Sequence, residues 1–277
     1  MTPVDPDVVF AAARPFLGMR VTGSELLSAD AFLDELAKAD VVCVGEDHAD
    51  APSHFAELSV IRGLIERAAM NGREVSVGIE MLPRSAQPVI ERWRKGELGE
   101  AEFLEKSAWK TSWGYDFSYY RPQLELARDS GLEIVALNAP AKLTRKIARV
   151  GLAGLSPEEE EDLPSLDLGN PDHRAWFERQ MHAHPMPHAG LGNLYVAQVV
   201  WDESMAEAIA RWVGSRLPGR QMVVMAGAGH CLGGAIPARV QRRSGAHVVG
   251  VRPLVEGADD ARSDSEGFDF LFSMRDP

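Results

Sequence analysis

The sequence predicts an α/β fold: a mostly parallel sheet flanked by helices, with a helical insertion that caps the carboxyl edge of the strands. Three features predict it. Short apolar runs alternate with helical segments through residue 138, which is the rhythm of strand–helix–strand units with parallel strands. Several of these runs stop abruptly at a glycine or a polar residue. From 142 to 217 the strand-like runs disappear and a helical pattern replaces them.

The elements follow from the spacing of apolar residues. We expect 1–40 to be helical and peripheral, with a capped helix at 31–39. Apolar residues at helical spacing predict a helix over 52–70, and much of 86–108 and the segment 122–130 are also expected to be helical. The predicted strands are 41–45, 75–80, 133–138, 222–226, 247–251 and 268–272.

The segment 142–217 is predicted to be a helical subdomain inserted within a single domain that spans 1–277. Prolines and glycines break it into short helices, and a long helix is expected over 195–216. The acidic run 158–162 is typical of a helix start, where carboxylates interact favourably with the helix dipole. We therefore expect this subdomain to cover the edge of the sheet.

Composition limits the classes of partner and the cellular location. The formal net charge of -12 argues against nucleic acid or an anionic membrane as partner, and no apolar run is long enough to span a bilayer. The first residues lack the basic start of a signal peptide, so a cytoplasmic protein is expected; the alternative is an exported or membrane-anchored protein whose signal has been removed. Cys43 and Cys231, which lie beside two similar motifs, are expected to stay reduced.

Polar residues follow four of the predicted strands. Gly45-Glu46-Asp47-His48 and Gly227-Ala228-Gly229-His230 each deliver a histidine three residues after a glycine, and two other strands end on Glu80 and Asn138. Ligands bind outside the carboxyl ends of parallel strands, so His48, Glu80, Asn138 and His230 are expected to share one crevice. A simpler explanation for each motif is a polar turn between a strand and a helix.

Imidazole and carboxylate together suggest metal ligation or acid–base chemistry. One hypothesis is that His48, Glu80 and His230 hold a divalent metal (zinc, manganese or cobalt), with Glu46 and His48 as the catalytic residues of a hydrolase. In that mechanism Glu46 activates a metal-bound water. The alternative is a hydrogen-bonded cluster of two histidines and a glutamate with a purely structural role.

Two further segments could hold a flat cofactor. The stretch 109–120 is rich in aromatic residues, among them Trp109, Trp113 and Tyr120, which could fill the core or line an apolar pocket. A short tract with two methionines also contains three histidines: His182, His184 and His188. Histidine, methionine and tyrosine are all axial ligands of haem iron, although a polar loop is the simpler explanation of the tract.

These motifs, in this order, resemble those of the ChaN-like haem-binding uptake proteins of the Tiki superfamily, over roughly residues 20 to 255. The stretches that carry the resemblance are Gly45 to His48, Glu80-Met81 with Gln87, Trp109 to Trp113, Tyr120-Arg121-Pro122, Leu137 to Pro140, Ala197-Gln198 with Trp201 to Ala206, and Ala226 to His230 with Ile236-Pro237.

The resemblance implies an α/β fold with a helical subdomain, binding of haem or another porphyrin, and a link to iron uptake. It implies Tyr120 as the preferred iron ligand and a homodimer as one form of assembly, with Trp109, Trp113 and Asn138 as further candidate haem contacts. The histidine-rich tract adds His182, His184 and His188 as candidates from its own composition. The wider superfamily also contains Tiki-type proteases and erythromycin-esterase-like enzymes with similar glycine-x-x-histidine pairs. The resemblance therefore favours a haem-binding protein, with a metal-dependent hydrolase as the alternative.

Overall fold

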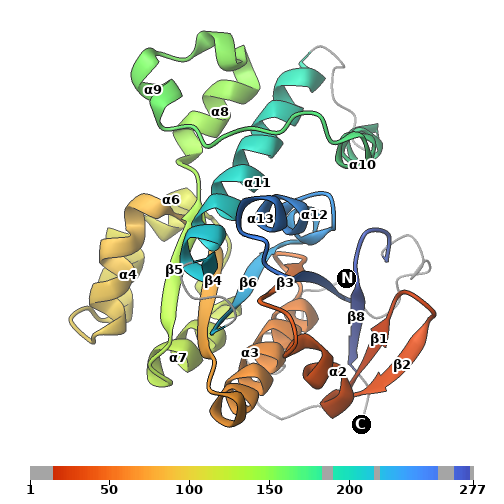
Figure 1. Cartoon of the computed structure of the whole chain (residues 1–277). Coiled ribbons are helices and arrows are strands. Elements are labelled where there is room, and N and C mark those ends of the chain that lie inside the picture. Colours follow the sequence, from red (N-terminus) through yellow and green to blue (C-terminus); the bar gives the residue numbers. More distant parts are fainter. Residues whose placement is uncertain (1–14, 183–189, 215–218, 255–264, 275–277) are drawn as a thin grey trace.

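The computed structural model describes residues 15–182, 190–214, 219–254 and 265–274 (Figure 1). Eight strands form one sheet in the order β2-β1-β8-β7-β3-β6-β4-β5. The strands are β1 (Phe16–Arg20), β2 (Glu25–Ser28), β3 (Val41–Glu46), β4 (Glu74–Pro83), β5 (Glu133–Asn138), β6 (Arg220–Gly227), β7 (Val248–Pro253) and β8 (Phe270–Met274).

The six strands predicted from apolar runs are all present, and every pairing among them is parallel. β3 lies at the centre between β6 and β7, and all six of its residues are buried. A strand covered on both faces reads as a continuous apolar run, as this one does. The predicted class, a mostly parallel α/β sheet flanked by helices, is therefore confirmed.

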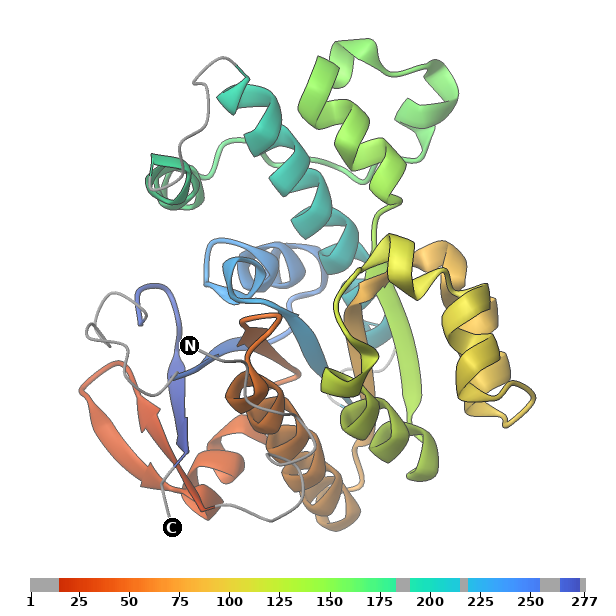
Figure 2. The ribbon, with the colours of Figure 1, turned by 180° about the vertical axis from the view of Figure 1, so that it is seen from behind.

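The prediction for 1–40 was wrong in part. β1 and β2 form a hairpin that extends the sheet antiparallel to β8 (Figure 2). The ring of Phe16 stacks on Phe272 of β8 at 4.6 Å between centroids, so the strand is stabilised by a partner from the other end of the chain. The helix expected at 31–39 exists as α2 (Ala29–Leu36), where the Ser28 side chain accepts a hydrogen bond from the backbone N–H of Ala31.

Helices cover both faces of the sheet. Alternate residues of β3 point to opposite sides: Val42 and Val44 join one apolar core, and Val41 and Cys43 join another. The first core includes α3 (Ala51–Asn71) and α7 (Arg121–Asp129), and the second includes α11 (Leu191–Gly214) and α13 (Ile236–Ser244). Across the described ranges, no helix combines the length and the apolar character needed to span a bilayer.

Short elements connect the layers and shape the ends of the strands. Between β4 and β5 the chain forms η1 (Arg84–Ala86), α4 (Gln87–Arg94), α5 (Glu100–Lys106), α6 (Trp109–Ser112) and η2 (Phe117–Tyr119) before α7. After β6 it forms the single turn α12 (Ala228–Cys231) before α13. These connections place the aromatic stretch 109–120 beside the ends of the parallel strands.

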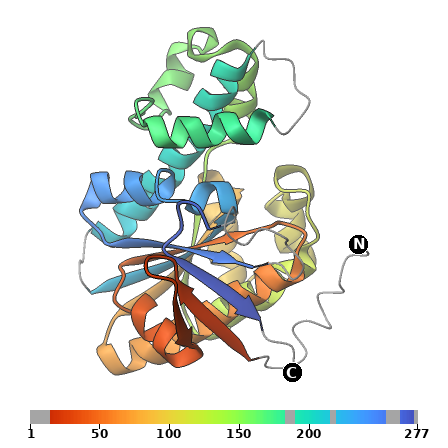
Figure 3. The same ribbon diagram turned by 90° about the vertical axis from the view of Figure 1, so that its right-hand side faces the viewer.

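The helices after β5 stand above the sheet (Figure 3). They are α8 (Ala141–Val150), η3 (Leu152–Gly154), α9 (Pro157–Glu161), α10 (Pro171–His182) and the first half of α11. Ser156 and Glu159 form a capping box at the start of α9, so the acidic run begins a helix as expected. Residues of α10 and α11 line a cavity with the ends of β3 and β6, which makes these helices the cap of the carboxyl edge.

The expectation that both cysteines remain reduced was wrong, because the structure joins Cys43 to Cys231 in a disulfide. Cys43 lies in β3, and Cys231 ends the turn α12 that follows the neighbouring strand β6. The parallel pairing of the two strands brings the Cα atoms to 5.3 Å, within the range that a disulfide spans. Composition gave no sign of it, since 188 residues separate the two positions in sequence.

This bond should be detectable as missing thiol. We expect no free thiol in the denatured, unreduced chain, and reduction should lower the free energy of unfolding by about 2–4 kcal/mol because the unfolded chain loses a long-range constraint. Thiol titration in denaturant and thermal melts with and without reductant measure the two effects. A Cys43→Ala/Cys231→Ala double variant is the control, because its melt should be insensitive to reductant. Two free thiols per chain in protein purified without reductant would contradict the disulfide.

Candidate functional site

Polar residues at the carboxyl ends of four parallel strands meet in one cavity. His48, Glu80, Asn138 and His230 all line a cavity of about 340 Å³, called here the Glu80 cavity. His48 and His230 follow β3 and β6, and Asn138 ends β5. Glu80 lies near the carboxyl end of β4, which continues to Pro83, three residues beyond the predicted end. The four strands are adjacent in the sheet in the order β3-β6-β4-β5. The convergence predicted from the strand ends is confirmed, because parallel strands deliver their carboxyl ends to the same edge.

Gly227 allows the two histidine motifs to pack against each other. A Cβ atom at this position would lie 2.8 Å from Cε1 of His48 and 3.6 Å from Oε2 of Glu80. The first distance is shorter than carbon atoms tolerate, so any side chain here would displace the His48 ring. The backbone N–H of Gly227 also donates to Glu80 Oε2 at 2.7 Å, which holds the carboxylate in the cavity.

Glu46 and Tyr120 orient the first histidine. His48 Nδ1–H donates to Glu46 Oε1 at 2.6 Å, and the hydroxyl of Tyr120 donates to the same oxygen at 2.9 Å. The rings of Trp113 and Tyr115 contact the imidazole at 4.6 and 5.0 Å between centroids. Because Nδ1 is held by the buried carboxylate, the Nε2 atom is the one left to face the crevice.

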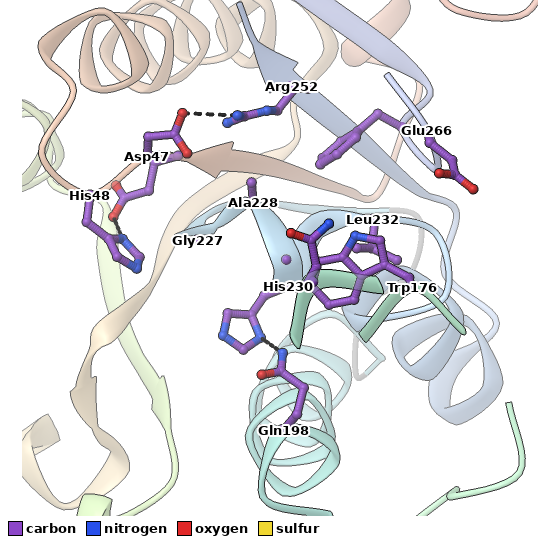
Figure 4. Close-up of a pocket in the computed structure, with 14 residues that line it drawn as sticks. Asp47, His48, Trp176, Gln198, Gly227, Ala228, His230, Leu232, Arg252 and Glu266 are labelled. Carbon is purple, nitrogen blue, oxygen red and sulfur yellow. Dashed lines mark hydrogen bonds and ion pairs between the residues drawn. The ribbon is translucent and has the colours of Figure 1, made fainter. Parts of the chain in front are cut away.

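Asp202 orients the second histidine in the same way. His230 Nδ1–H donates to Asp202 Oδ1 at 2.6 Å, and Nε2 lies 3.4 Å from Glu80 Oε1. His173 Nε2 lies 3.1 Å from the other oxygen of Asp202. Figure 4 shows the rings of His48 and His230 entering the space below Gly227 from two sides. The site thus contains two imidazoles, each backed by a buried carboxylate, with Glu80 against the second.

The charged groups around His230 stabilise one another in their ionised forms. Burial opposes a charged imidazole, but the neighbouring carboxylates Glu80 and Asp202 outweigh it and raise the pKa of His230 to about 10. Burial likewise opposes ionisation of Asp202, yet His230 and His173 lower its pKa to about 2. The pKa of Glu80 is also lowered, against the effect of burial, chiefly by His230. At neutral pH the group is therefore an imidazolium between two carboxylates.

The environment of Glu46 is different. Burial, reinforced by the nearby Glu57 carboxylate, raises the pKa of Glu46 to about 8, and burial raises the pKa of Glu57 to about 8 as well. The pKa of His48 is raised because its hydrogen bond to Glu46 and the charge of Glu80 overcome partial burial. Burial lowers the pKa of His54, which lies beside both glutamates. Two carboxylates with perturbed pKa values thus stand behind His48.

A second cavity adjoins the first. It has a volume of about 470 Å³, and His48 and His230 line both, so the two cavities meet at the histidines. We call it the Arg252 cavity, after the guanidinium that pairs with Asp47 at 3.0 Å at its edge (Figure 4). Trp176 from α10 and Gln198 from α11 close its other side.

The candidate haem contacts fall in different places. Trp113 lines the Glu80 cavity, whereas Trp109 is buried in the core against Phe117, at 5.0 Å between ring centroids. Tyr120 is fully buried and its hydroxyl is directed to Glu46. His182 ends α10, where Nδ1–H donates to the carbonyl of Glu178. His184 and His188 lie outside the described residues.

The sequence analysis missed several residues of the site: Asp202, Gln198, Arg252 and Trp176. A signal existed for two of them. Gln198 and Asp202 are four residues apart on a predicted helix and therefore share one face. They flank Trp201, which also lines the Glu80 cavity.

The proposed metal ligands were His48, Glu80 and His230. Among the described residues, the group of potential ligands whose atoms all lie within 4.8 Å of one another is a different one: Glu46, His54 and Glu57. All three are buried, and Glu46 contacts the Nδ1 atom of His48. The assignment of a metal to the crevice therefore stays a prediction.

Comparisons with known proteins identify the family of this chain and support its fold. A family model described as haem-binding uptake, Tiki superfamily, ChaN, matches residues 32–240. A solved structure described as cofacial haem binding to ChaN of Campylobacter jejuni superposes with a TM-score of 0.73 at 18% identity, and the match covers 95% of this chain and 98% of that one.

A curated relative from Arabidopsis thaliana, Protein RETICULATA-RELATED 5, chloroplastic, is 26% identical over 226 residues. The match takes in 76% of this chain but 30% of the plant protein, so the chain corresponds to less than a third of that relative's length.

Proposed function

This chain belongs to the ChaN family of haem-binding uptake proteins in the Tiki superfamily, and we propose that it binds haem or another porphyrin at the carboxyl edge of its sheet. The observation that carries the proposal is the pair of imidazoles at the junction of the two cavities. Nδ1 of His48 is held by the buried carboxylate of Glu46, so its Nε2 is the atom offered to a ligand in the crevice. Nε2 of the protonated His230 faces Glu80 instead, so this second imidazole contributes a positive charge beside the ligand. Imidazole nitrogen is a common axial ligand of haem iron.

The surroundings suit a flat, amphipathic ligand. The cavities, of about 340 and 470 Å³, meet at the histidines and lie within the size range of small-molecule sites. Trp113, Tyr115 and Trp201 supply aromatic walls to the first. Arg252 at the edge of the second is the type of side chain that pairs with a propionate carboxylate.

We propose His48 as the iron ligand, because its side chain is 28% exposed whereas that of His230 is 10% exposed and lies between two carboxylates. Tyr120, the ligand expected from the resemblance, would first have to leave Glu46. Burial and the adjacent carboxylates raise the pKa of its phenol, which disfavours the phenolate that iron binds.

Haem titration tests the proposal. The full chain should give a saturable Soret shift, and His48→Gln should weaken binding by about tenfold or more, equivalent to about 1.4 kcal/mol. His247→Gln is the matched control, because His247 is exposed just before β7, at the amino end of the strands, and should leave the titration unchanged. A Soret band altered by Tyr120→Phe and not by His48→Gln would move the iron to the tyrosine. A flat titration at micromolar haem would overturn the proposal.

A homodimer is part of the same proposal, since a haem ligated on one face leaves the other face open to a second chain. Light scattering of the protein before and after haem addition measures it. The mass of a single chain under both conditions would contradict the dimer but would not bear on haem binding.

A hydrolase is the second candidate, and the carboxylate-backed imidazoles favour it specifically. In such a mechanism His48 Nε2 takes a proton from a water or a substrate hydroxyl, Glu46 stabilises the resulting imidazolium, and the protonated His230 donates to the leaving group. In a second form of this candidate, His48, Glu80 and His230 would hold a divalent metal that supplies Lewis acidity, and Glu46 in place of His48 would activate the water.

Glu80→Gln separates the two candidates because it keeps the shape of the side chain and removes its charge. On the hydrolase proposal, turnover of ester or peptide substrates should fall by a factor of at least about 100. On the haem proposal alone, the wild type shows no such turnover and Glu80→Gln retains the Soret shift.

The location of the protein is also a proposal. The Cys43–Cys231 disulfide favours the second of the two locations considered, an oxidising compartment reached by export, because disulfides are rare in the reducing cytosol. Fractionation of the native host, with alkylation of free thiols before lysis, tests it. Native protein in the cytosolic fraction with both cysteines alkylated would restore the cytoplasmic expectation.

A further inference from the structure

Behind His48 lies a buried cluster with too many hydrogen-bond acceptors. It consists of Glu46, His54 and Glu57, all fully buried, and Gln123 from α7 packs against it. His54 Nδ1 lies 2.9 Å from Glu57 Oε2 and 3.2 Å from Glu46 Oε2. The three ligand atoms therefore face one another inside the protein, with no access to bulk water.

The tautomer of His54 leaves the cluster short of hydrogen-bond donors. Its Nε2 atom faces the backbone carbonyl of His48 at 3.2 Å, and a carbonyl can only accept, so Nε2 carries the proton. In the neutral ring, Nδ1 then presents a lone pair to two carboxylates. A histidine that donates one N–H to a carbonyl and directs its other nitrogen at carboxylates has the arrangement of a metal-ligating histidine.

The buried atoms that lack a hydrogen-bond partner also point to a cation in this cluster. Three buried side-chain oxygens here accept no hydrogen bond: Glu46 Oε2, Glu57 Oε1 and Gln123 Oε1. Gln123 Oε1 is an acceptor, because the amide is fixed by Nε2, which donates to His54 O and Glu57 Oε2. Burial raises the pKa of both glutamates to about 8, so without a metal they hold protons at neutral pH, and a bound cation would displace those protons. Unpaired buried acceptors are costly, and a cation placed among them would satisfy several at once.

We propose that Glu46, His54 and Glu57 form the binding site of a divalent first-row metal cation, of the class of zinc or manganese. Neutral imidazole and carboxylates are the natural ligands of both. Around a tetrahedral zinc, neighbouring ligand atoms stand about 3.3 Å apart, close to the separations of 2.9 and 3.2 Å found here. Because the ligands are fully buried, the site is closed, which is typical of a structural metal.

The cation would act on the crevice through Glu46. Oε2 of this carboxylate faces the cluster, whereas Oε1 accepts from His48 Nδ1 and from the hydroxyl of Tyr120. A metal on Oε2 fixes the carboxylate and thereby the imidazole it holds. Glu46 is thus a positioning residue, and the metal links α3 and the end of β3 to the haem or hydrolase site without belonging to either.

Metal content tests the site directly. The full chain, produced with zinc or manganese in the medium and with any affinity tag removed, should retain about one metal ion per chain after extensive buffer exchange. Glu57→Gln keeps the side-chain shape and removes a ligand charge. It should lower the metal affinity by more than about 100-fold, since loss of an outer-shell partner alone costs about 10–100-fold.

Two matched variants exclude other sites. Glu80→Gln should keep the metal, because Glu80 belongs to the crevice, and so should the triple variant His182→Ala/His184→Ala/His188→Ala. Loss of the metal in Glu80→Gln with retention in Glu57→Gln would transfer the metal to the crevice and overturn the proposal. Loss in the triple variant alone would also overturn it.

A measurement on the wild type guards against a Glu57→Gln chain that fails to fold. Refolding the metal-free wild type with cobalt(II) should give the visible absorption of a protein-bound ion, and the same ion should raise the melting temperature. Fewer than about 0.1 ions per chain after refolding with zinc, manganese or cobalt, and no change in melting, would overturn the proposal. The three acceptors would then share protons instead. Haem titration of the same samples tests the haem proposal separately, so failure of the metal site and failure of haem binding can be distinguished.

Discussion

Glu203→Ala should lower the free energy of unfolding by about 3–5 kcal/mol, because removing one partner of a buried ion pair leaves the others uncompensated. Glu203 lies on α11 and is fully buried. Its carboxylate holds three guanidinium groups from α13: Arg242 at 2.7 Å, Arg243 at 2.7 Å and Arg239 at 3.4 Å. It also accepts from the backbone N–H of Asp167, which ties the helical cap to the sheet layer.

Glu207→Ala is the control, since it removes the same carboxylate one turn further along α11. Glu207 pairs with Arg84 at 2.6 Å, but both side chains are 29% exposed, and pairs of this kind contribute about 1 kcal/mol or less. Denaturant unfolding of the two variants measures the difference. Equal losses of unfolding free energy in Glu203→Ala and Glu207→Ala would show that burying the Glu203 carboxylate among its three arginines adds nothing to stability.

His230→Gln should also cost about 3–5 kcal/mol at pH 6.5, because the buried carboxylates of Glu80 and Asp202 would lose the cation between them. The control is His247→Gln, on the exposed turn before β7, where the expected change lies within about 0.5 kcal/mol. Urea unfolding at fixed pH measures both. A His230→Gln chain as stable as wild type would mean that the two carboxylates find other donors.

The pH dependence of stability follows from the same group. The pKa of His230 is about 10 in the folded chain against an ordinary histidine value of 6.5 in the unfolded chain, so the folded state holds this proton more tightly. Its contribution is complete below pH 6.5 and is lost as pH rises through 10. The gap in unfolding free energy between wild type and His230→Gln should therefore narrow between pH 6.5 and 10. A gap that widens over this range would contradict the imidazolium assignment.

The positions of the parallel strands along the chain could be predicted from the sequence, because they depend on local patterns of apolar residues. Apolar runs such as Val75 to Ile79 cannot be exposed, and the residue that ends each run has to leave the sheet at its carboxyl edge. The convergence of Glu80, Asn138 and the two histidines followed from that geometry alone. The resemblance to a family rested on the same residues, and the family match confirmed it.

Contacts between distant segments could not be read in this way. The β1–β2 hairpin depends on Phe272, and the disulfide depends on β3 lying beside β6. Asp202 was missed because it lies on a helix that was assigned to the cap, and only the tertiary structure turns it toward His230.

The sequence by itself determined which residue types reach the edge of the sheet: two histidines, a glutamate and an asparagine. Only the tertiary structure decided which carboxylate stands behind each imidazole, and that Tyr120 and His54 lie behind Glu46. The physical reason is that strand periodicity is set by neighbours in the chain, whereas burial and pairing of charges are set by elements that meet only when the fold closes.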